Sequence, residues 1–132
     1  MAKHIPDKFR DLLSKKTFAH LATISPEGQP QVTPVWIDAE GDVLRVNSAK
    51  GRAKDRNMRK DARVALSILD PDNPYRHLAV QGRVADISEA GAEEHIDTLA
   101  KKYLGLDRYP NRQPGEKRVI YKIEPLSVST MG

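Results

Sequence analysis

The chain of 132 residues contains no cysteine. Disulfides, thiolate nucleophiles, iron–sulfur clusters and cysteine-ligated zinc sites are therefore excluded. The four histidines lie far apart and form no metal-ligand spacing, so we expect no bound metal. No run approaches the roughly 18 apolar residues that a membrane-spanning helix needs, and the N-terminal segment has no apolar signal-peptide stretch. We expect a cytoplasmic protein with no membrane partner.

Aromatic residues are also scarce, at 5% of the chain. A barrel that stacks nucleic-acid bases needs exposed aromatic side chains on its strands, and no predicted strand carries such a pair. We therefore expect no nucleic-acid partner, although a basic barrel that contacts phosphates is the competing interpretation from another functional class. The net charge of +4 suits an anionic ligand without identifying it.

Apolar segments separated by turn-forming residues recur along the chain, which has the length of one domain, residues 1–132. The predicted strands span residues 17–25, 29–38, 43–48, 62–70, 77–88 and 118–129. The predicted helices span residues 6–16, 50–61 and 88–104. This order of elements predicts an α+β domain in which six antiparallel strands form a closed or half-closed barrel with peripheral helices.

Two of these elements carry further signals. Pro34 cannot donate a ladder hydrogen bond, which places its strand at a sheet edge or a bulge and leaves backbone groups near it free for a ligand. Trp36 is the single tryptophan, and both a core position and a pocket wall are open to it. In the third helix, one apolar stripe is predicted to contain Ala92, Ile96, Leu99 and Tyr103, and Gly105 is predicted to end the helix.

The densest positive charge lies between residues 50 and 60. Six basic residues accompany one acid, Asp55; they are Lys50, Arg52, Lys54, Arg56, Arg59 and Lys60. The segment directly follows the polar strand end Asn47–Ser48, so strand end and helix start form one corner. Such corners seat phosphates, because a glycine (Gly51) permits close approach and the helix N-terminus offers free N–H groups. The alternative is a solvated charged helix, and its few apolar residues predict poor burial.

Residues 21–37 (LATISPEGQPQVTPVWI) and 47–66 (NSAKGRAKDRNMRKDARVAL) together resemble the pyridoxamine 5′-phosphate oxidase-like superfamily. More narrowly, they resemble its branch of flavin/deazaflavin oxidoreductases, group B. The resemblance extends over nearly the whole chain through QGRV, YLG and PGEKRVIYKIEP at 81–84, 103–105 and 114–125.

The resemblance implies an FMN-binding split β-barrel homodimer whose two cofactor sites lie between subunits. Residues matching Arg52, Lys54 and Asn57 would bind the phosphate end of the cofactor. Those matching Thr33, Val35 and Ser48 would line its ring or ribityl region. The full candidate cofactor site is Thr33, Pro34, Val35, Trp36, Asn47, Ser48, Lys50, Arg52, Ala53, Lys54, Arg56 and Asn57.

Members of this branch use the deazaflavin coenzyme F420, FMN, haem or no known cofactor. Coenzyme F420 carries a phosphodiester and a polyglutamate tail, so the surplus cations Lys50, Arg56 and Arg59 favour it over FMN. The resemblance then implies an F420-dependent reductase that transfers a hydride to a small electron-poor acceptor, such as a quinone, conjugated carbonyl or nitro compound. An FMN-dependent reductase and a non-catalytic cofactor-binding protein are the alternatives.

The resemblance also has limits. The sequence ends at SVSTMG without the Arg- and His-bearing extension of true pyridoxamine phosphate oxidases, so we do not expect vitamin B6 oxidation. No catalytic residue is assigned. The candidate proton donors are His77, Tyr75, Tyr103 and Tyr109. Of the other histidines, His20 is expected to be structural, whereas His4 and His95 are expected to face solvent.

Overall fold

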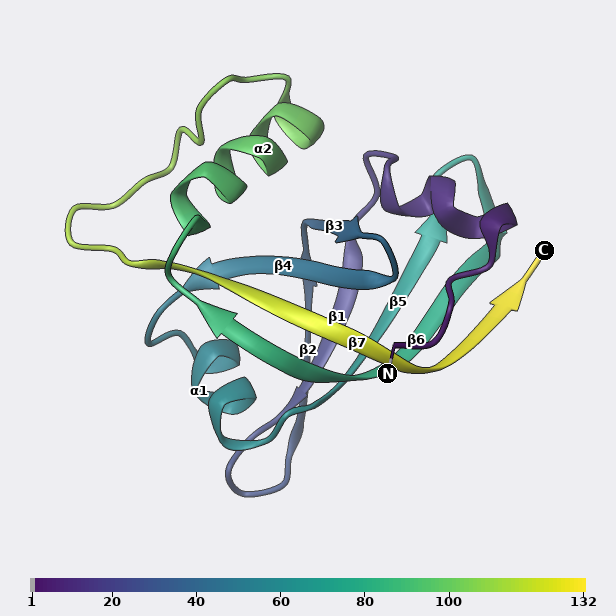
Figure 1. The fold of residues 1–132 in the computed structure, drawn as a ribbon, viewed down its shortest axis with the longest axis horizontal. Helices are drawn as coiled ribbons and strands as arrows, with labels where there is room; N and C mark the ends of the chain where they lie inside the picture. The colour runs from purple at the N-terminus through teal and green to yellow at the C-terminus, as the bar shows by residue number, and fades with distance from the viewer. Residues whose placement is uncertain (1) are drawn as a thin grey trace.

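A computed structural model describes residues 2–132, in which one antiparallel sheet curls into a half-open barrel (Figure 1). The strands are β1 (Ala19–Ile24), β2 (Pro30–Val35), β3 (Ile37–Glu40), β4 (Val43–Ala49), β5 (Arg63–Asp70), β6 (Asn73–Ser88) and β7 (Arg118–Met131). Alternate side chains of these strands fill the interior of the curl with Leu, Ile and Val. The predicted α+β class and the curled antiparallel sheet are thereby confirmed.

The prediction of six strands was wrong, because the sheet has seven. The strand expected over residues 29–38 is divided at Trp36: β2 pairs with β1, whereas β3 pairs with β4. The sheet order is β2-β1-β5-β6-β7-β4-β3, so the two edge strands are consecutive in the chain. The residues on both sides of Trp36 are strand-forming, but the strand they pair with changes there. The alternation of apolar and polar residues does not reveal which strand is the partner. The edge position predicted from Pro34 is confirmed.

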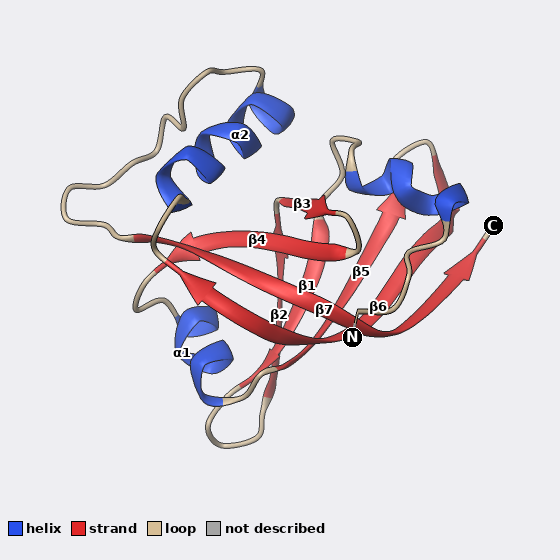
Figure 2. Cartoon of the chain, viewed as in Figure 1, coloured by secondary structure: helices blue, strands red, loops and turns tan. Residues whose placement is uncertain are grey.

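Three helical segments lie outside the sheet, and α1 and α2 flank the end of β4 (Figure 2). They are η1 (Asp7–Leu13), α1 (Ala53–Lys60) and α2 (Ala92–Leu104). The first is a 3-10 helix, shorter than the helix predicted over residues 6–16, and its apolar residues Phe9, Leu12 and Leu13 are buried. Helix α2 begins later than predicted because β6 continues to Ser88. It ends at Gly105, as expected, with a left-handed φ of 72°. No helix within the described residues is long and apolar enough to cross a bilayer.

Helix α1 is better buried than its composition predicts. Its polar residues Asp55 and Asn57 face the barrel and are 2% and 5% exposed. The Asp55 carboxylate accepts hydrogen bonds from the Gly51 N–H and the buried Tyr121 hydroxyl, at 2.9 and 2.5 Å. The Asn57 amide donates to Thr23 Oγ1 at 3.0 Å. Hydrophobic periodicity does not predict such a buried face, because the residues that form it are polar and hydrogen-bonded.

The close packing of β6 on β7 gives a test of the fold. A Cβ added to Gly82 would lie 2.8 Å from the Glu124 carbonyl oxygen and 2.8 Å from Ile123 Cγ2. Because the carbonyl belongs to the paired backbone, we expect Gly82→Ala to lower the free energy of unfolding by roughly 1–3 kcal/mol in urea titrations. Ala85→Ser, at an exposed position of the same strand, should change it by less than about 0.5 kcal/mol. Equal stability of the two variants would contradict this packing.

Candidate functional site

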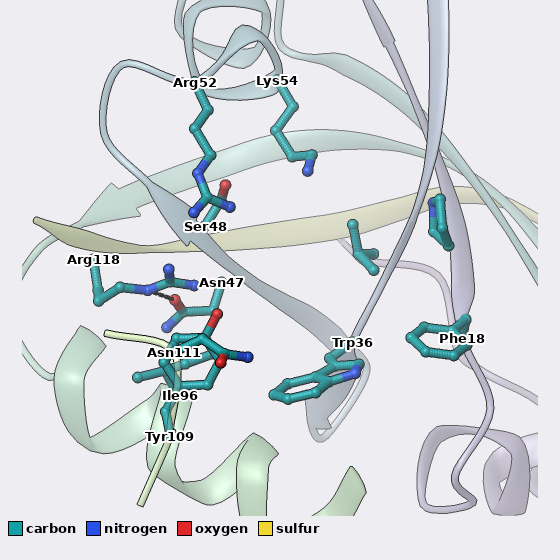
Figure 3. Close-up of a pocket in the computed structure, with 12 residues that line it drawn as sticks. Phe18, Trp36, Asn47, Ser48, Arg52, Lys54, Ile96, Tyr109, Asn111 and Arg118 are labelled. Carbon is teal, nitrogen blue, oxygen red and sulfur yellow. Dashed lines mark hydrogen bonds between the residues drawn. The ribbon is translucent and has the colours of Figure 1, made fainter. Parts of the chain in front are cut away.

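A pocket of about 210 Å³ lies where the β2–β3 joint, the end of β4, α1 and the loop after α2 meet (Figure 3). Its lining combines basic, amide and aromatic side chains. The lining residues are Phe18, Pro34, Val35, Trp36, Asn47, Ser48, Arg52, Lys54, Ile96, Tyr109, Asn111 and Arg118.

The pocket brings together most of the site predicted from sequence. The predicted residues that line it are Pro34, Val35, Trp36, Asn47, Ser48, Arg52 and Lys54. Lys50 is exposed and lies 3.5 Å from Glu89, and Thr33 pairs with Leu21 in the sheet. Ala53, Arg56 and Asn57 line a different pocket, beside the β1–β2 turn. The predicted set therefore divides between the two sides of α1.

The basic end of the pocket is built by the turn from β4 into α1. Gly51 has a φ of 93°, a left-handed conformation that glycine adopts without strain, and the chain reverses there. Ser48 ends buried at the base of this turn, and its Oγ is the one fully buried side-chain polar atom in residues 2–132 without a hydrogen-bond partner. Arg52 and Lys54 reach over the same region (Figure 3). A buried, unpaired hydroxyl beside two cations suits an anionic ligand.

The pocket also carries unneutralised positive charge. Burial, and then the charges of Arg52 and Arg118, lower the pKa of Lys54 below its ordinary value. Glu116 lies between the two arginines, 3.2 Å from Arg52 Nη2 and 3.1 Å from Arg118 Nη1. Within the described chain, Lys54 has no carboxylate within ion-pair distance. One carboxylate thus faces three cations, and a bound anion would relieve their mutual repulsion.

The opposite end of the pocket is aromatic. The Trp36 ring stacks on Tyr103 at 5.1 Å between centroids with an interplanar angle of 8°, and Tyr109 meets Trp36 edge-on at 6.0 Å. Tyr103 was expected to extend the apolar stripe of α2. Instead its hydroxyl donates to the Thr17 carbonyl at 2.7 Å and accepts from the Ile37 N–H at 3.1 Å. Trp36 is therefore half-buried on a rigid support and forms a pocket wall.

A family model described as pyridoxamine 5′-phosphate oxidase matches residues 5–132. The chain belongs to the pyridoxamine 5′-phosphate oxidase family. A solved structure named F420 reductase is 36% identical, covers 95% of this chain and 98% of that chain, and has a TM-score of 0.83. A conserved hypothetical protein from Mycobacterium tuberculosis is 22% identical over 98% of this chain and 86% of its own, with a TM-score of 0.75. HupZ from Group A Streptococcus is 19% identical over 96% and 93%, with a TM-score of 0.70.

Five lining residues of this family member were missing from the predicted set. They are Phe18, Ile96, Tyr109, Asn111 and Arg118. Of these, Tyr109 was named only as a proton-donor candidate. Arg118 opens β7, and it reaches the pocket because β7 pairs with β4, more than sixty residues earlier in the chain. The sequence shows only that a basic residue begins the last predicted strand. Its place in the pocket depends on a long-range strand pairing that the sequence does not reveal.

The proton-donor candidates also separate in space. Tyr109 lines the pocket, whereas Tyr103 lies behind Trp36. Tyr75 is 78% exposed, and neither it nor His77 is a lining residue. Tyr109 is thus the candidate placed to meet a bound molecule.

The charge at Lys54 yields a stability test on the protein without ligand. The pKa of Lys54 is lower in the folded protein than in the unfolded chain, so the charged ammonium group destabilises the fold. This destabilisation is fully present below the folded-state pKa and disappears as the pH rises through the unfolded-state pKa. We expect Lys54→Met, which keeps the apolar stem, to raise the melting temperature by a few degrees at pH 7 and to have little effect above about pH 10.5. The exposed Lys60→Met on the same helix is the control, with no gain. A lower melting temperature for Lys54→Met would mean that the fold itself satisfies the ammonium group.

Proposed function

We propose that this protein is a coenzyme F420-dependent reductase that transfers a hydride between the deazaflavin and an electron-poor organic acceptor. The observation that carries the proposal is the pocket itself, which joins a cationic end with an unpaired buried hydroxyl to an aromatic wall. A planar redox cofactor with a phosphate group has the complementary chemistry, with an aromatic ring for the wall and an anion for the cationic end. The similarity to a structure named F420 reductase, at 36% identity, supports the deazaflavin as its ring.

The residues present fit such a cofactor. Ser48, Arg52, Lys54 and Arg118 would hold its phosphate, since they supply a hydroxyl and three cations to one region. Val35 and Trp36 would lie beside its ring. The bound cofactor would supply the two-electron hydride chemistry, which these side chains cannot provide. The protein would orient the ring and keep water from it, with Tyr109 as the pocket residue able to hold a transferable proton.

The charge outside the pocket supports F420 over FMN. Of the three surplus cations, Arg59 is paired with Asp55 at 3.0 Å, whereas Lys50 and Arg56 are exposed near the β4–α1 turn and would meet an anionic tail that extended from the pocket around α1. FMN has no such tail and would leave Lys50 with Glu89 alone. If no anionic tail binds these cations, the alternatives are an FMN-dependent reductase of the same fold and a non-catalytic cofactor-binding protein.

We further propose that the protein is a homodimer that pairs through the outer face of its sheet. Two rows of residues cross β2, β1, β5, β6 and β7 without a Lys, Arg, Asp or Glu. The rows are Pro34, His20, Ser67, Ala79 and Ser129, and Val32, Ala22, Ala65, Gln81 and Ser127. In a chain with 30% charged residues, a hollowed face of uncharged, mostly small side chains suits a second copy. Pro34 also lines the pocket, so a partner on this face would lie beside the cofactor site.

The reductase proposal is tested by following the absorbance of F420 as its reduced form is oxidised by quinones, nitro compounds and conjugated ketones. We expect Arg52→Ala with Lys54→Ala to weaken cofactor binding by about 3–6 kcal/mol, because each contact is charge-assisted at about 1.5–3 kcal/mol. The matched control is Lys60→Ala with Arg63→Ala, which removes the same charge outside the pocket and should leave binding unchanged. Equal loss in the two double variants would assign the effect to overall charge.

The dimer proposal is tested by light scattering after gel filtration. Ala65 lies in the middle of the uncharged face, so we expect Ala65→Arg to convert a dimer into a monomer by burying an unpaired charge. Ala85→Arg, an exposed position of β6 outside the two rows, should remain dimeric. A monomeric wild type, or a dimeric Ala65→Arg variant, would contradict this interface.

A further inference from the structure

Behind the pocket, a hydrogen-bonded chain connects Arg118 to the buried imidazole of His95. We propose that His95 is a positioning residue: as a neutral imidazole it fixes the amide of Asn47, which in turn fixes the Arg118 guanidinium at the pocket wall. The inference rests on the proposed function for what Arg118 binds, but not for how Arg118 is held. It also corrects the expectation that His95 faces solvent, since it is 4% exposed.

The chain begins at the pocket (Figure 3). Arg118 Nε donates to Asn47 Oδ1 at 2.9 Å. Asn47 Nδ2 then contacts two groups of α2, the Ala92 carbonyl at 3.0 Å and His95 Nδ1 at 3.1 Å. On the far side of the ring, His95 Nε2 lies 3.0 Å from Asp38 Oδ1 on β3. Four separate elements, β7, β4, α2 and β3, therefore meet in one polar line.

The direction of each hydrogen bond follows from two groups whose roles cannot change. The Arg118 Nε–H only donates, and the Ala92 carbonyl only accepts. Asn47 must therefore turn its oxygen to Arg118 and its NH₂ to Ala92. The second N–H of that NH₂ points at His95 Nδ1, which has to be the unprotonated, accepting nitrogen. The imidazole proton then lies on Nε2 and is donated to Asp38.

Asp38 anchors the outer end of the line. Burial would raise its pKa, but the hydrogen bonds from His95 and Arg45, together with the charge of Arg45, leave the pKa below its ordinary value. Arg45 Nη2 donates to Asp38 Oδ2 at 2.8 Å. An ionised Asp38, held in place by Arg45, accepts the Nε2 proton and thereby keeps Nδ1 free for Asn47.

The inner end controls a cation of the pocket. Arg118 is 5% exposed and packs 5.2 Å from the Tyr109 ring centroid. Its Nη1 donates to Glu116 at 3.1 Å, and its Nε donates to Asn47. No protein group within residues 2–132 accepts from its Nη2. Because Nε and Nη1 are both hydrogen-bonded, the direction of Nη2 is fixed as well. Losing the hydrogen bond to Asn47 would allow the guanidinium plane to rotate.

Two substitutions separate positioning from support. Asn at position 95 places an oxygen near the Nδ1 site, so His95→Asn keeps the acceptor for Asn47 and loses the donor to Asp38. Gln reaches the Nε2 site, so His95→Gln keeps the donor and loses the acceptor. Each variant loses one buried hydrogen bond, so both should lower the melting temperature by a similar amount.

The deciding measurement is ¹H–¹⁵N NMR of the protein without ligand, with the Arg118 Nε–H signal assigned by Arg118→Lys. We expect that signal to keep its wild-type shift in His95→Asn and to move or exchange away in His95→Gln. Coenzyme F420 affinity should follow the same order, unchanged within about twofold in His95→Asn and weaker by about tenfold in His95→Gln. In the wild type, the ring spectrum should show a proton on Nε2 and none on Nδ1.

A protonated Nδ1 in the wild type, or an Arg118 signal that responds equally to the two variants, would overturn the role of His95. The wild-type ring spectrum gives this answer even if a variant fails to fold. If the wild type binds no F420 or FMN, the proposed function fails, while the NMR signals still decide how Arg118 is held.

Discussion

The structure depends on one constraint, which is that the chain leaves one edge of the sheet at Trp36 and immediately begins the opposite edge. Strands β2 and β3 are consecutive in sequence but terminal on opposite sides of the sheet, so the sheet has to curl until its edges meet. The Tyr103 hydroxyl fixes this joint by bridging the backbones of Thr17 and Ile37. The pocket forms beside the joint, because the curl brings Trp36 close to the paired ends of β4 and β7.

The pocket is positively charged partly because the acid of the basic segment points away from it. Asp55 is the one acid in the basic segment, and its carboxylate points into the protein, where Tyr121 and the Gly51 N–H hydrogen-bond it. Arg52 and Lys54 therefore reach the pocket without that acid between them. Burial, and then the charges of Arg52 and Arg118, disfavour the charged form of Lys54 in the ligand-free protein, so a bound anion would be favoured there.

Local signals in the sequence predicted much of this arrangement, and long-range pairing determined the rest. The β4–α1 corner follows from a glycine between a polar strand end and a basic helix, and Pro34 correctly placed its strand at an edge. The division at Trp36 was not predictable, since the residues on both sides are strand-forming. Arg118 and His95 were also missed, because their roles come from β7 pairing with β4 and α2 packing over Asn47. Buried polar partners leave no periodic pattern.

The cationic pocket is proposed to bind a deazaflavin cofactor. The most direct measurement is an equilibrium titration of the purified protein with coenzyme F420 and, separately, with FMN, following the quenching of each cofactor's fluorescence. We expect micromolar or tighter binding of F420 and weaker binding of FMN. Tighter binding of FMN, or binding of neither cofactor, would contradict the proposal.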